Sequence, residues 1–185
     1  YLGALDDDFA HAVVTDQFDT GDNMTDSIAS LAALRDSHSP VRDALFARFE
    51  AKWRDEPLAL DKWFELQAQS ARDDTLDGVR SLLAHPRFNA RNPNRVRALV
   101  GAFTLRNFSC FNAADGAGYA FAAEQVRTLD TINPQLAAAI AGAFNLWRRF
   151  GEPRRTQMQQ SLQRIARTRG LSPDVAEVVT RTLAL

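Results

Sequence analysis

The sequence feature that most constrains the fold is a polar residue followed by proline, a pair that recurs along the chain. A polar side chain before a proline is typical of a helix start, because it caps free backbone N–H groups where proline has none to lose. The pairs are Ser39-Pro40, Glu56-Pro57, Asn92-Pro93, Asn133-Pro134, Glu152-Pro153 and Ser172-Pro173. Thr25-Asp26 is a further start, and Gly21, Gly151 and Gly170 stand where helices should end. Together these signals predict helix starts near residues 4, 25, 40, 57, 75, 94, 117, 134, 153 and 173.

Between these starts, apolar residues recur at helical intervals. Leu136, Ile140 and Phe144, for example, follow one another at every fourth position. No run of alternating β-branched residues indicates a strand. The starts are one helix plus a short loop apart, so a helical hairpin recurs about every 35 to 40 residues, as in α-solenoids. The sequence therefore predicts an all-α fold, a solenoid-like superhelical array of about ten antiparallel helices, forming one domain over residues 1–185.

Composition excludes several classes of protein. Of the 185 residues 45% are apolar and 24% are charged, which is an ordinary globular mixture and excludes a disordered or collagenous chain. No apolar run is long enough for a membrane span. Cys110 is the one cysteine, so no internal disulfide can form, which favours a reducing, cytoplasmic location. The chain begins at Tyr1 without a methionine or a leader, and we expect it to be a piece of a longer protein.

The residues that carry common catalytic chemistry are missing or isolated. His11, His38 and His85 stand alone, without the second histidine and the glutamate of a zinc helix or a pair of cysteines. No nucleophile elbow or phosphate-binding loop is present, and Cys110 lies in an apolar context. Residues 116–118 begin like a dinucleotide fingerprint, but a phenylalanine replaces its third glycine. We expect no catalytic residue, metal or cofactor in this chain.

Charge is distributed unevenly along the chain. Residues 1–26 carry seven aspartates and no cationic residue, and we expect the run at 6–8 to complement a helix dipole. Residues 147–169 carry seven arginines against Glu152, a balance of +6. These arginines scatter around a helix rather than sharing a face, which favours a solvated surface or pairing with the acidic segment. Nucleic-acid binding through 147–169 stays open as a less favoured alternative.

Six short segments occur in an order and at a spacing that are familiar from one family. On these segments the whole chain resembles the C-terminal helical domain of bacterial aminopeptidase N, a zinc-dependent alanyl aminopeptidase of the gluzincin type. The segments are Asp22-Asn23-Met24-Thr25-Asp26, Arg42-Asp43-Ala44-Leu45, Asp61-Lys62-Trp63-Phe64, Asn92-Pro93-Asn94-Arg95-Val96-Arg97, Asp115-Gly116-Ala117-Gly118-Tyr119 and Asn133-Pro134-Gln135.

The resemblance implies a function for the parent protein and a supporting role for this domain. The parent removes N-terminal amino acids from peptides, and its zinc ligands and substrate-anchoring segment lie in a preceding thermolysin-like domain. The C-terminal domain packs over that catalytic domain and encloses the active-site chamber, which restricts or positions peptide substrates. The implied partners are the catalytic domain of the same polypeptide and peptide substrates, with no nucleic acid and no membrane.

Three residues are candidates for facing the chamber. Arg97, one turn into its helix, is suited to a substrate carboxylate or carbonyl, and Gln135, beside a helix start, is suited to a peptide group. Tyr119 is the third candidate. Each has a structural alternative, as an interhelical pair, a cap or a core residue. Ala139 stands where relatives can carry an arginine, so one peptide contact is expected to be missing. The alternative for the whole chain is a free-standing helical scaffold that binds peptides or proteins.

Overall fold

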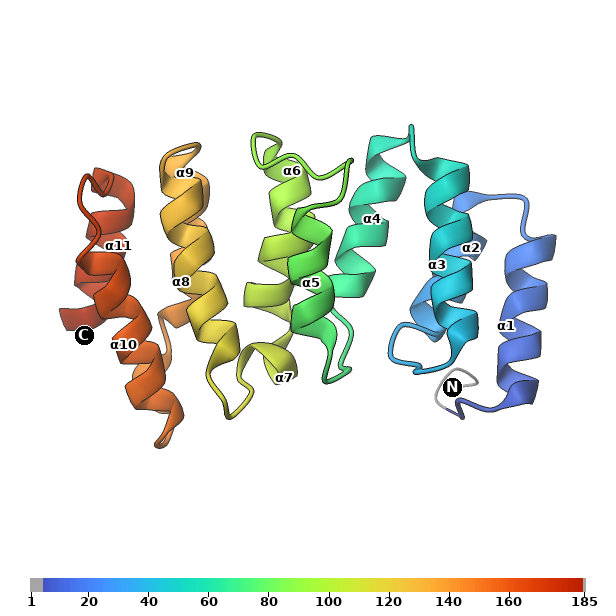
Figure 1. Cartoon of the computed structure of the whole chain (residues 1–185), viewed down its shortest axis with the longest axis horizontal. Coiled ribbons are helices and arrows are strands. Elements are labelled where there is room, and N and C mark those ends of the chain that lie inside the picture. The colour runs from blue at the N-terminus through green and yellow to red at the C-terminus, as the bar shows by residue number, and fades with distance from the viewer. Residues whose placement is uncertain (1–4, 185) are drawn as a thin grey trace. The chain divides into compact units, whose positions relative to one another are not determined.

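Every regular element in the described part of the chain, residues 5–184, is a helix in the computed structural model (Figure 1). The chain divides into two compact units, Tyr1–Arg87 and Phe88–Leu185. None of the described helices is both long enough and apolar enough to cross a membrane.

The first unit packs five helices around a largely aliphatic and aromatic core. Leu45 and Phe49 of α3 lie with Leu60 and Phe64 of α4 at exposures of 2% or less. The indole of Trp63 donates a hydrogen bond of 2.8 Å to a backbone carbonyl of α3, which ties the two helices together. The helices are α1 (Asp8–Thr20), α2 (Met24–Ala33), α3 (Pro40–Trp53), α4 (Pro57–Ala68) and α5 (Thr75–Leu83).

Side chains cap the first three helices of this unit, whereas Glu56, expected to cap α4, makes no capping hydrogen bond and leaves Pro57 as the start signal. Asp7 caps α1 by accepting a 2.8 Å hydrogen bond from the amide of Ala10, and Asp8 lies in the first turn, where its charge opposes the helix dipole. Asn23 caps α2 and Ser39 caps α3 in the same manner. Two of the three aspartates of the run thus stand at the N-terminus of α1, while Asp6 pairs with His11 and Ser37.

The second unit contains six α-helices and three tighter or wider helical segments. Helix α8 packs against both α9 and α10. The elements are α6 (Pro93–Val96), the π-helix η2 (Arg97–Arg106), α7 (Phe108–Phe111), α8 (Ala117–Asp130), α9 (Pro134–Ala141), the 3₁₀ turns η3 (Gly142–Phe144) and η4 (Trp147–Arg149), α10 (Arg154–Ala166) and α11 (Pro173–Ala184).

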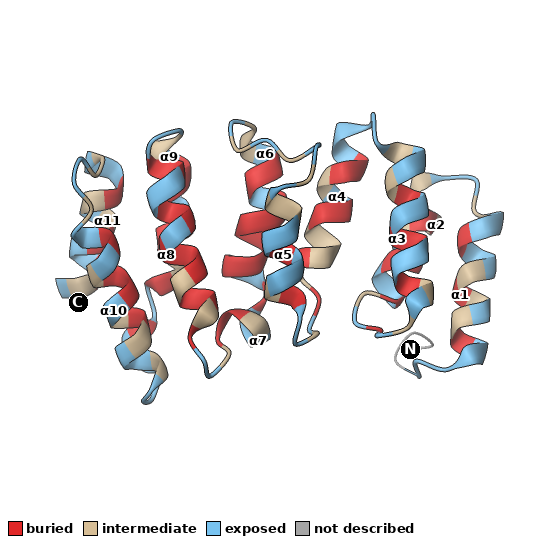
Figure 2. Cartoon of the chain, in the orientation of Figure 1, coloured by how far each residue is buried: buried red, intermediate tan, exposed pale blue. Residues whose placement is uncertain are grey.

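Five aromatic rings form the centre of the second unit, among the buried residues of Figure 2. Their ring centroids lie 5.2 to 6.4 Å apart, mostly edge to face, which is the favoured aromatic geometry. Beside them the indole of Trp147 donates a 2.9 Å hydrogen bond to the carbonyl of Thr182 near the end of α11. The five rings belong to Phe103, Phe111, Tyr119, Phe121 and Phe144.

The structure confirms the all-α prediction and corrects it in three places. The helix expected from residue 94 is α-helical for only four residues and continues as a ten-residue π-helix. The irregular segment 107–118 contains one helical turn, α7. Pro153 is the N-cap residue of α10 instead of its first helical residue, since the helix begins at Arg154.

Candidate functional site

Arg97 stands where α6 passes into η2. Its backbone N–H closes the α-turn on the carbonyls of Pro93 and Asn94. Its side chain is exposed, and Nη1 donates a 3.3 Å hydrogen bond to the amide oxygen of Asn94. Asn92 caps the turn beneath by accepting hydrogen bonds from two backbone amides. The guanidinium is thus anchored at its base and open to an anionic or carbonyl group from solvent.

Gln135 lies in the first turn of α9 and is also exposed. Asn133 caps this helix by accepting a 3.1 Å hydrogen bond from the amide of Leu136. Leu136 and Ala137 are buried, so they fix the helix against its neighbours. The primary amide of Gln135 offers both donors and an acceptor, which match the backbone of a peptide.

The fold brings Arg97 and Gln135 to the same end of the second unit. Along the chain α8 follows η2 and α7 and precedes α9, and it runs back towards the end where α6 begins, so α9 starts at that end (Figure 1). The two elements are in direct contact, and a Cβ built at Gly101 of η2 would lie 3.7 Å from Cδ1 of Ile140 in α9. Ala139, one turn beyond Gln135, is exposed and adds no polar group.

Tyr119 lies elsewhere. It belongs to the first turn of α8, at the other end of that helix, and its side chain is fully buried. Its hydroxyl donates a 2.9 Å hydrogen bond to Oδ1 of Asn112, and burial raises the pKa of the phenol above its usual value of 10.0. The structure therefore does not bring Tyr119 together with Arg97 and Gln135, and places it as a core residue that supports the loop before α8.

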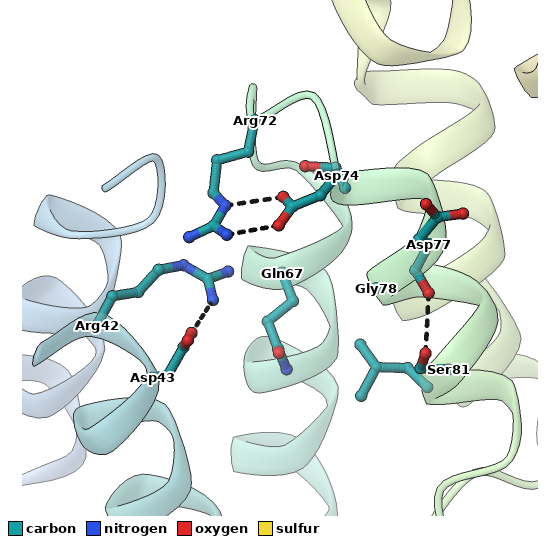
Figure 3. A pocket seen from close by; sticks show the side chains of 10 residues that line it. Arg42, Asp43, Gln67, Arg72, Asp74, Asp77, Gly78 and Ser81 are labelled. Carbon is teal, nitrogen blue, oxygen red and sulfur yellow. Dashed lines mark hydrogen bonds and ion pairs between the residues drawn. The ribbon is translucent and has the colours of Figure 1, made fainter. Parts of the chain in front are cut away.

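A charged pocket of about 280 Å³, which the sequence did not reveal, lies in the first unit (Figure 3). Arg42 donates a 2.7 Å hydrogen bond to Asp43, and Arg72 binds Asp74 through two hydrogen bonds of 2.6 and 2.8 Å. This pairing lowers the pKa of Asp74 and raises that of Arg72. The wall is completed by side chains of α4 and α5, among them Gln67.

The arginines of this pocket also hold backbone. Arg42 donates through Nε to the carbonyl of Arg35, and Arg72 donates through Nη1 to the carbonyl of Ser37. Both guanidinium groups thus fasten the loop between α2 and α3. Arg72 also fastens it to the loop between α4 and α5, where Arg72 itself lies. We interpret the pocket as a structural clasp. Arg72 and Ser37 are 35 residues apart in sequence, so only the fold reveals this contact.

The isolated titratable residues do not assemble into a metal site. Nε2 of His11 lies 2.8 Å from a carboxylate oxygen of Asp6, and His85 packs against the ring of Trp63 with centroids 5.2 Å apart. Over residues 5–184 no three histidine, cysteine or acidic side chains lie close enough together to hold an ion.

Part of the arginine-rich segment is used within the second unit. Arg148 donates to the carbonyls of Thr182 and Leu183, and Nε of Arg154 donates a 2.7 Å hydrogen bond to the carbonyl of Asn112. Arg155 is paired with Glu152. Arg148 and Arg154 thus bond backbone carbonyls at the end of α11 and in the loop before α8.

A second pocket, of about 230 Å³, is lined mainly by apolar side chains of the second unit. Leu105, Phe108 and Leu146 line it with exposures of 51%, 74% and 54%. Phe108 stacks on Phe150 with ring centroids 6.2 Å apart. Large exposed apolar side chains in one place are typical of a surface that meets another protein surface.

Residues 1–184 match a protein family described as "Domain of unknown function (DUF3458_C) ARM repeats". The chain belongs to this family. ARM repeats are stacked helical units in which each repeat contacts its neighbours, so the predicted solenoid-like class of fold is confirmed.

Similar proteins are aminopeptidases. The chain is 39% identical to aminopeptidase N of Escherichia coli over 175 residues and 37% identical to that of Haemophilus influenzae over 171 residues, covering 95% and 92% of this chain. Among solved structures, aminopeptidase A of Legionella pneumophila in complex with aspartic acid matches 95% of the chain with a TM-score of 0.88 and 30% identity. The chain spans about a fifth of the length of each of these proteins. The resemblance to the C-terminal helical domain of bacterial aminopeptidase N is therefore confirmed.

Proposed function

We propose that this chain is the non-catalytic wall domain of a zinc aminopeptidase, which packs over the catalytic domain, encloses the active-site chamber and positions peptide substrates. The observation that carries the proposal is the pair of exposed polar side chains, Arg97 and Gln135, at one end of the second unit. The 39% sequence identity to aminopeptidase N of Escherichia coli, over 95% of this chain, supports the proposal that the parent protein is an aminopeptidase.

In this proposal, chemistry and positioning belong to different parts of one polypeptide. Zinc and the groups that cleave the N-terminal residue are supplied by the preceding part of the parent, since the described residues here do not assemble ligands for an ion. The partners are that catalytic domain and peptide substrates, with no nucleic acid and no membrane, and the parent acts in the cytoplasm.

The two side chains have complementary tasks. The guanidinium of Arg97 binds a substrate carboxylate or a carbonyl oxygen, and the amide of Gln135 pairs with a peptide group beyond the scissile bond. A peptide held at both points presents its N-terminal residue to the catalytic domain in fewer orientations, which lowers the entropic part of the barrier. Enclosure admits short peptides and flexible N-termini and keeps folded proteins out.

The test is peptide hydrolysis by the full-length parent. Arg97→Ala and Gln135→Ala should each raise KM for a tetrapeptide by roughly tenfold and leave hydrolysis of a single-residue chromogenic amide unchanged. Arg80→Ala and Gln160→Ala, which remove exposed side chains of the same types elsewhere, serve as matched controls. Equal kinetics of all four variants on the peptide would remove Arg97 and Gln135 from the site.

A reconstitution experiment tests the domain as a whole. The isolated chain should show no aminopeptidase activity with or without added zinc, and its addition to the separately expressed catalytic part should restore or reshape peptide cleavage. Zinc-dependent cleavage by the pure chain would contradict the assignment. A catalytic part that ignores the chain and forms no complex with it would favour a free-standing scaffold.

A further inference from the structure

The contact between η2 and α9 is made at a glycine that lies directly beneath Arg97. A Cβ built on Gly101 would lie 3.8 Å from Cβ of Arg97 and 3.7 Å from Cδ1 of Ile140. One buried position therefore touches both the stem of the candidate arginine and the helix that carries the candidate glutamine. Gly101 is itself buried.

The π-helix explains why Gly101 is so close to Arg97. In an α-helix, Cβ atoms four residues apart are about 5–6 Å apart. The corresponding distance is 3.8 Å here because η2 is wound with wider turns, in which hydrogen bonds reach five residues back, as from the amide of Asn107 to the carbonyl of Ala102. A larger side chain at position 101 would crowd the Arg97 stem from below.

Buried residues and one side-chain hydrogen bond stabilise the wide turns of η2. Residues 98–104 are buried, and the hydroxyl of Thr104 donates a 2.8 Å hydrogen bond to the carbonyl of Val100. π-helical segments are rare and occur frequently at functional sites. This one begins at Arg97 and presents its smallest residue, Gly101, to Ile140 of α9.

We propose that Gly101 is a positioning residue that sets the separation between the guanidinium of Arg97 and the amide of Gln135. The inference rests on the proposed function and adds a reason why the two side chains lie where they do. The space between η2 and Ile140 holds a single Cβ at position 101 and is closed beyond it by Cδ1 of Ile140, and Gln135 lies on the same short helix as Ile140. A branched side chain at 101 would push α9 outward and widen the gap that a bound peptide spans.

The choice of variants follows from the space around position 101. An alanine methyl at 101 would meet its neighbours at ordinary van der Waals distance, so Gly101→Ala should keep KM for a tetrapeptide within about twofold of wild type. The branched side chain of Gly101→Val exceeds the space, and we expect it to raise KM of the full-length parent for the tetrapeptide by roughly tenfold. Turnover of a single-residue chromogenic amide, which touches neither side chain, should not change.

Controls separate positioning from general destabilisation. Gly78→Val makes the same change inside α5, where no atom lies within 4 Å of the new Cβ, and should leave the peptide KM unchanged. Ile140→Val removes the methyl group that meets Gly101, and should also raise the peptide KM. It replaces Gly101→Val should that variant fail to fold.

A double-variant cycle gives the deciding readout. In an Arg97→Ala, Gln135→Ala background, Gly101→Val should add no further rise in the peptide KM, because the groups it displaces are gone. Equal losses on the tetrapeptide and the amide, or an undiminished effect in that background, would overturn the inference and leave Gly101 a packing residue. If Arg97→Ala and Gln135→Ala are silent, the proposed function fails first. If they raise KM and neither Gly101→Val nor Ile140→Val does, only the positioning role fails.

Discussion

Asn112 is the residue on which the loop before α8 depends. Its Oδ1 accepts the hydroxyl of Tyr119, its Nδ2 donates a 2.8 Å hydrogen bond to the carbonyl of Phe108, and its own carbonyl accepts from Arg154. Asn112 is 7% exposed, so any of these groups left without a partner would be shielded from water. A buried polar group without a partner costs more free energy than the hydrogen bond contributes when it is made.

Tyr119→Phe should therefore lower the free energy of unfolding by about 1–3 kcal/mol, because it leaves Oδ1 of Asn112 buried without the hydrogen bond from the Tyr119 hydroxyl. Urea denaturation followed by circular dichroism measures the change. Thr20→Val, which removes a hydroxyl that bonds a carbonyl on the exposed surface of α1, is the control and should cost clearly less. An equal fall in the free energy of unfolding for the two variants would mean that the buried bond to Asn112 contributes no more than an exposed one.

Asp130, at the end of α8, stabilises the loop between α10 and α11 through hydrogen bonds, as Asn112 does for the loop before α8. Its two carboxylate oxygens accept from the backbone amide of Ser172, at 2.9 Å, and from the hydroxyl of the same residue. Hydrogen bonds to charged groups contribute about 1.5–3 kcal/mol, so Asp130→Ala should reduce stability by an amount in this range. Hydrogen exchange should show the loss first as faster exchange in α11, and unchanged exchange there would contradict the assigned contact.

At the scale of elements, the helix starts were predictable and the π-helix was not. A start such as that of α3 is determined by Ser39 and Pro40 within a few residues of the chain. The winding of η2 has no such local signal, and the nearest side-chain atom to its Gly101 belongs to Ile140, almost forty residues along the chain. For the same reason the sequence offered Arg97, Gln135 and Tyr119 alike as candidates, since the burial of Tyr119 beside Phe111 and Phe144 depends on the fold.

The clasp between the loops of the first unit predicts an acid-sensitive element. Arg72 lowers the pKa of Asp74 below its ordinary 3.8, so the ionised pair stabilises the folded state fully above 3.8. This contribution is lost as the pH falls from 3.8 through the lowered folded pKa, where Asp74 takes up a proton. The loop between α4 and α5 should loosen in that window.

The variant Asp74→Asn tests this dependence. It should be less stable than wild type at pH 7, and should show a shallower fall in stability as the pH drops below about 4, since one carboxylate with a lowered pKa is gone. Asp77→Asn, which changes a neighbouring exposed carboxylate of α5, should keep the wild-type slope. Identical slopes for wild type and Asp74→Asn would show that the pair does not contribute.

For the molecule as a whole, the apolar surface of the second unit predicts how the isolated chain behaves in solution. Leu105, Phe108 and Leu146 are about half or more exposed around one pocket. An isolated chain with such a surface should self-associate at high concentration, and Phe108→Ser should shift it towards the monomer. Sedimentation velocity over a range of concentrations measures both, and a monomeric wild type would contradict the prediction.

The three tryptophans are divided between the two compact units: Trp53 and Trp63 lie in the first, and Trp147 lies in the second, with its indole bonded to the end of α11. A chain in which the first two are replaced by phenylalanine would emit from a single indole. Its emission maximum would shift to the red at the moment α11 detaches and water reaches the ring. The last helix thus carries its own optical reporter, and the unfolding of one half of the chain can be timed without interference from the other.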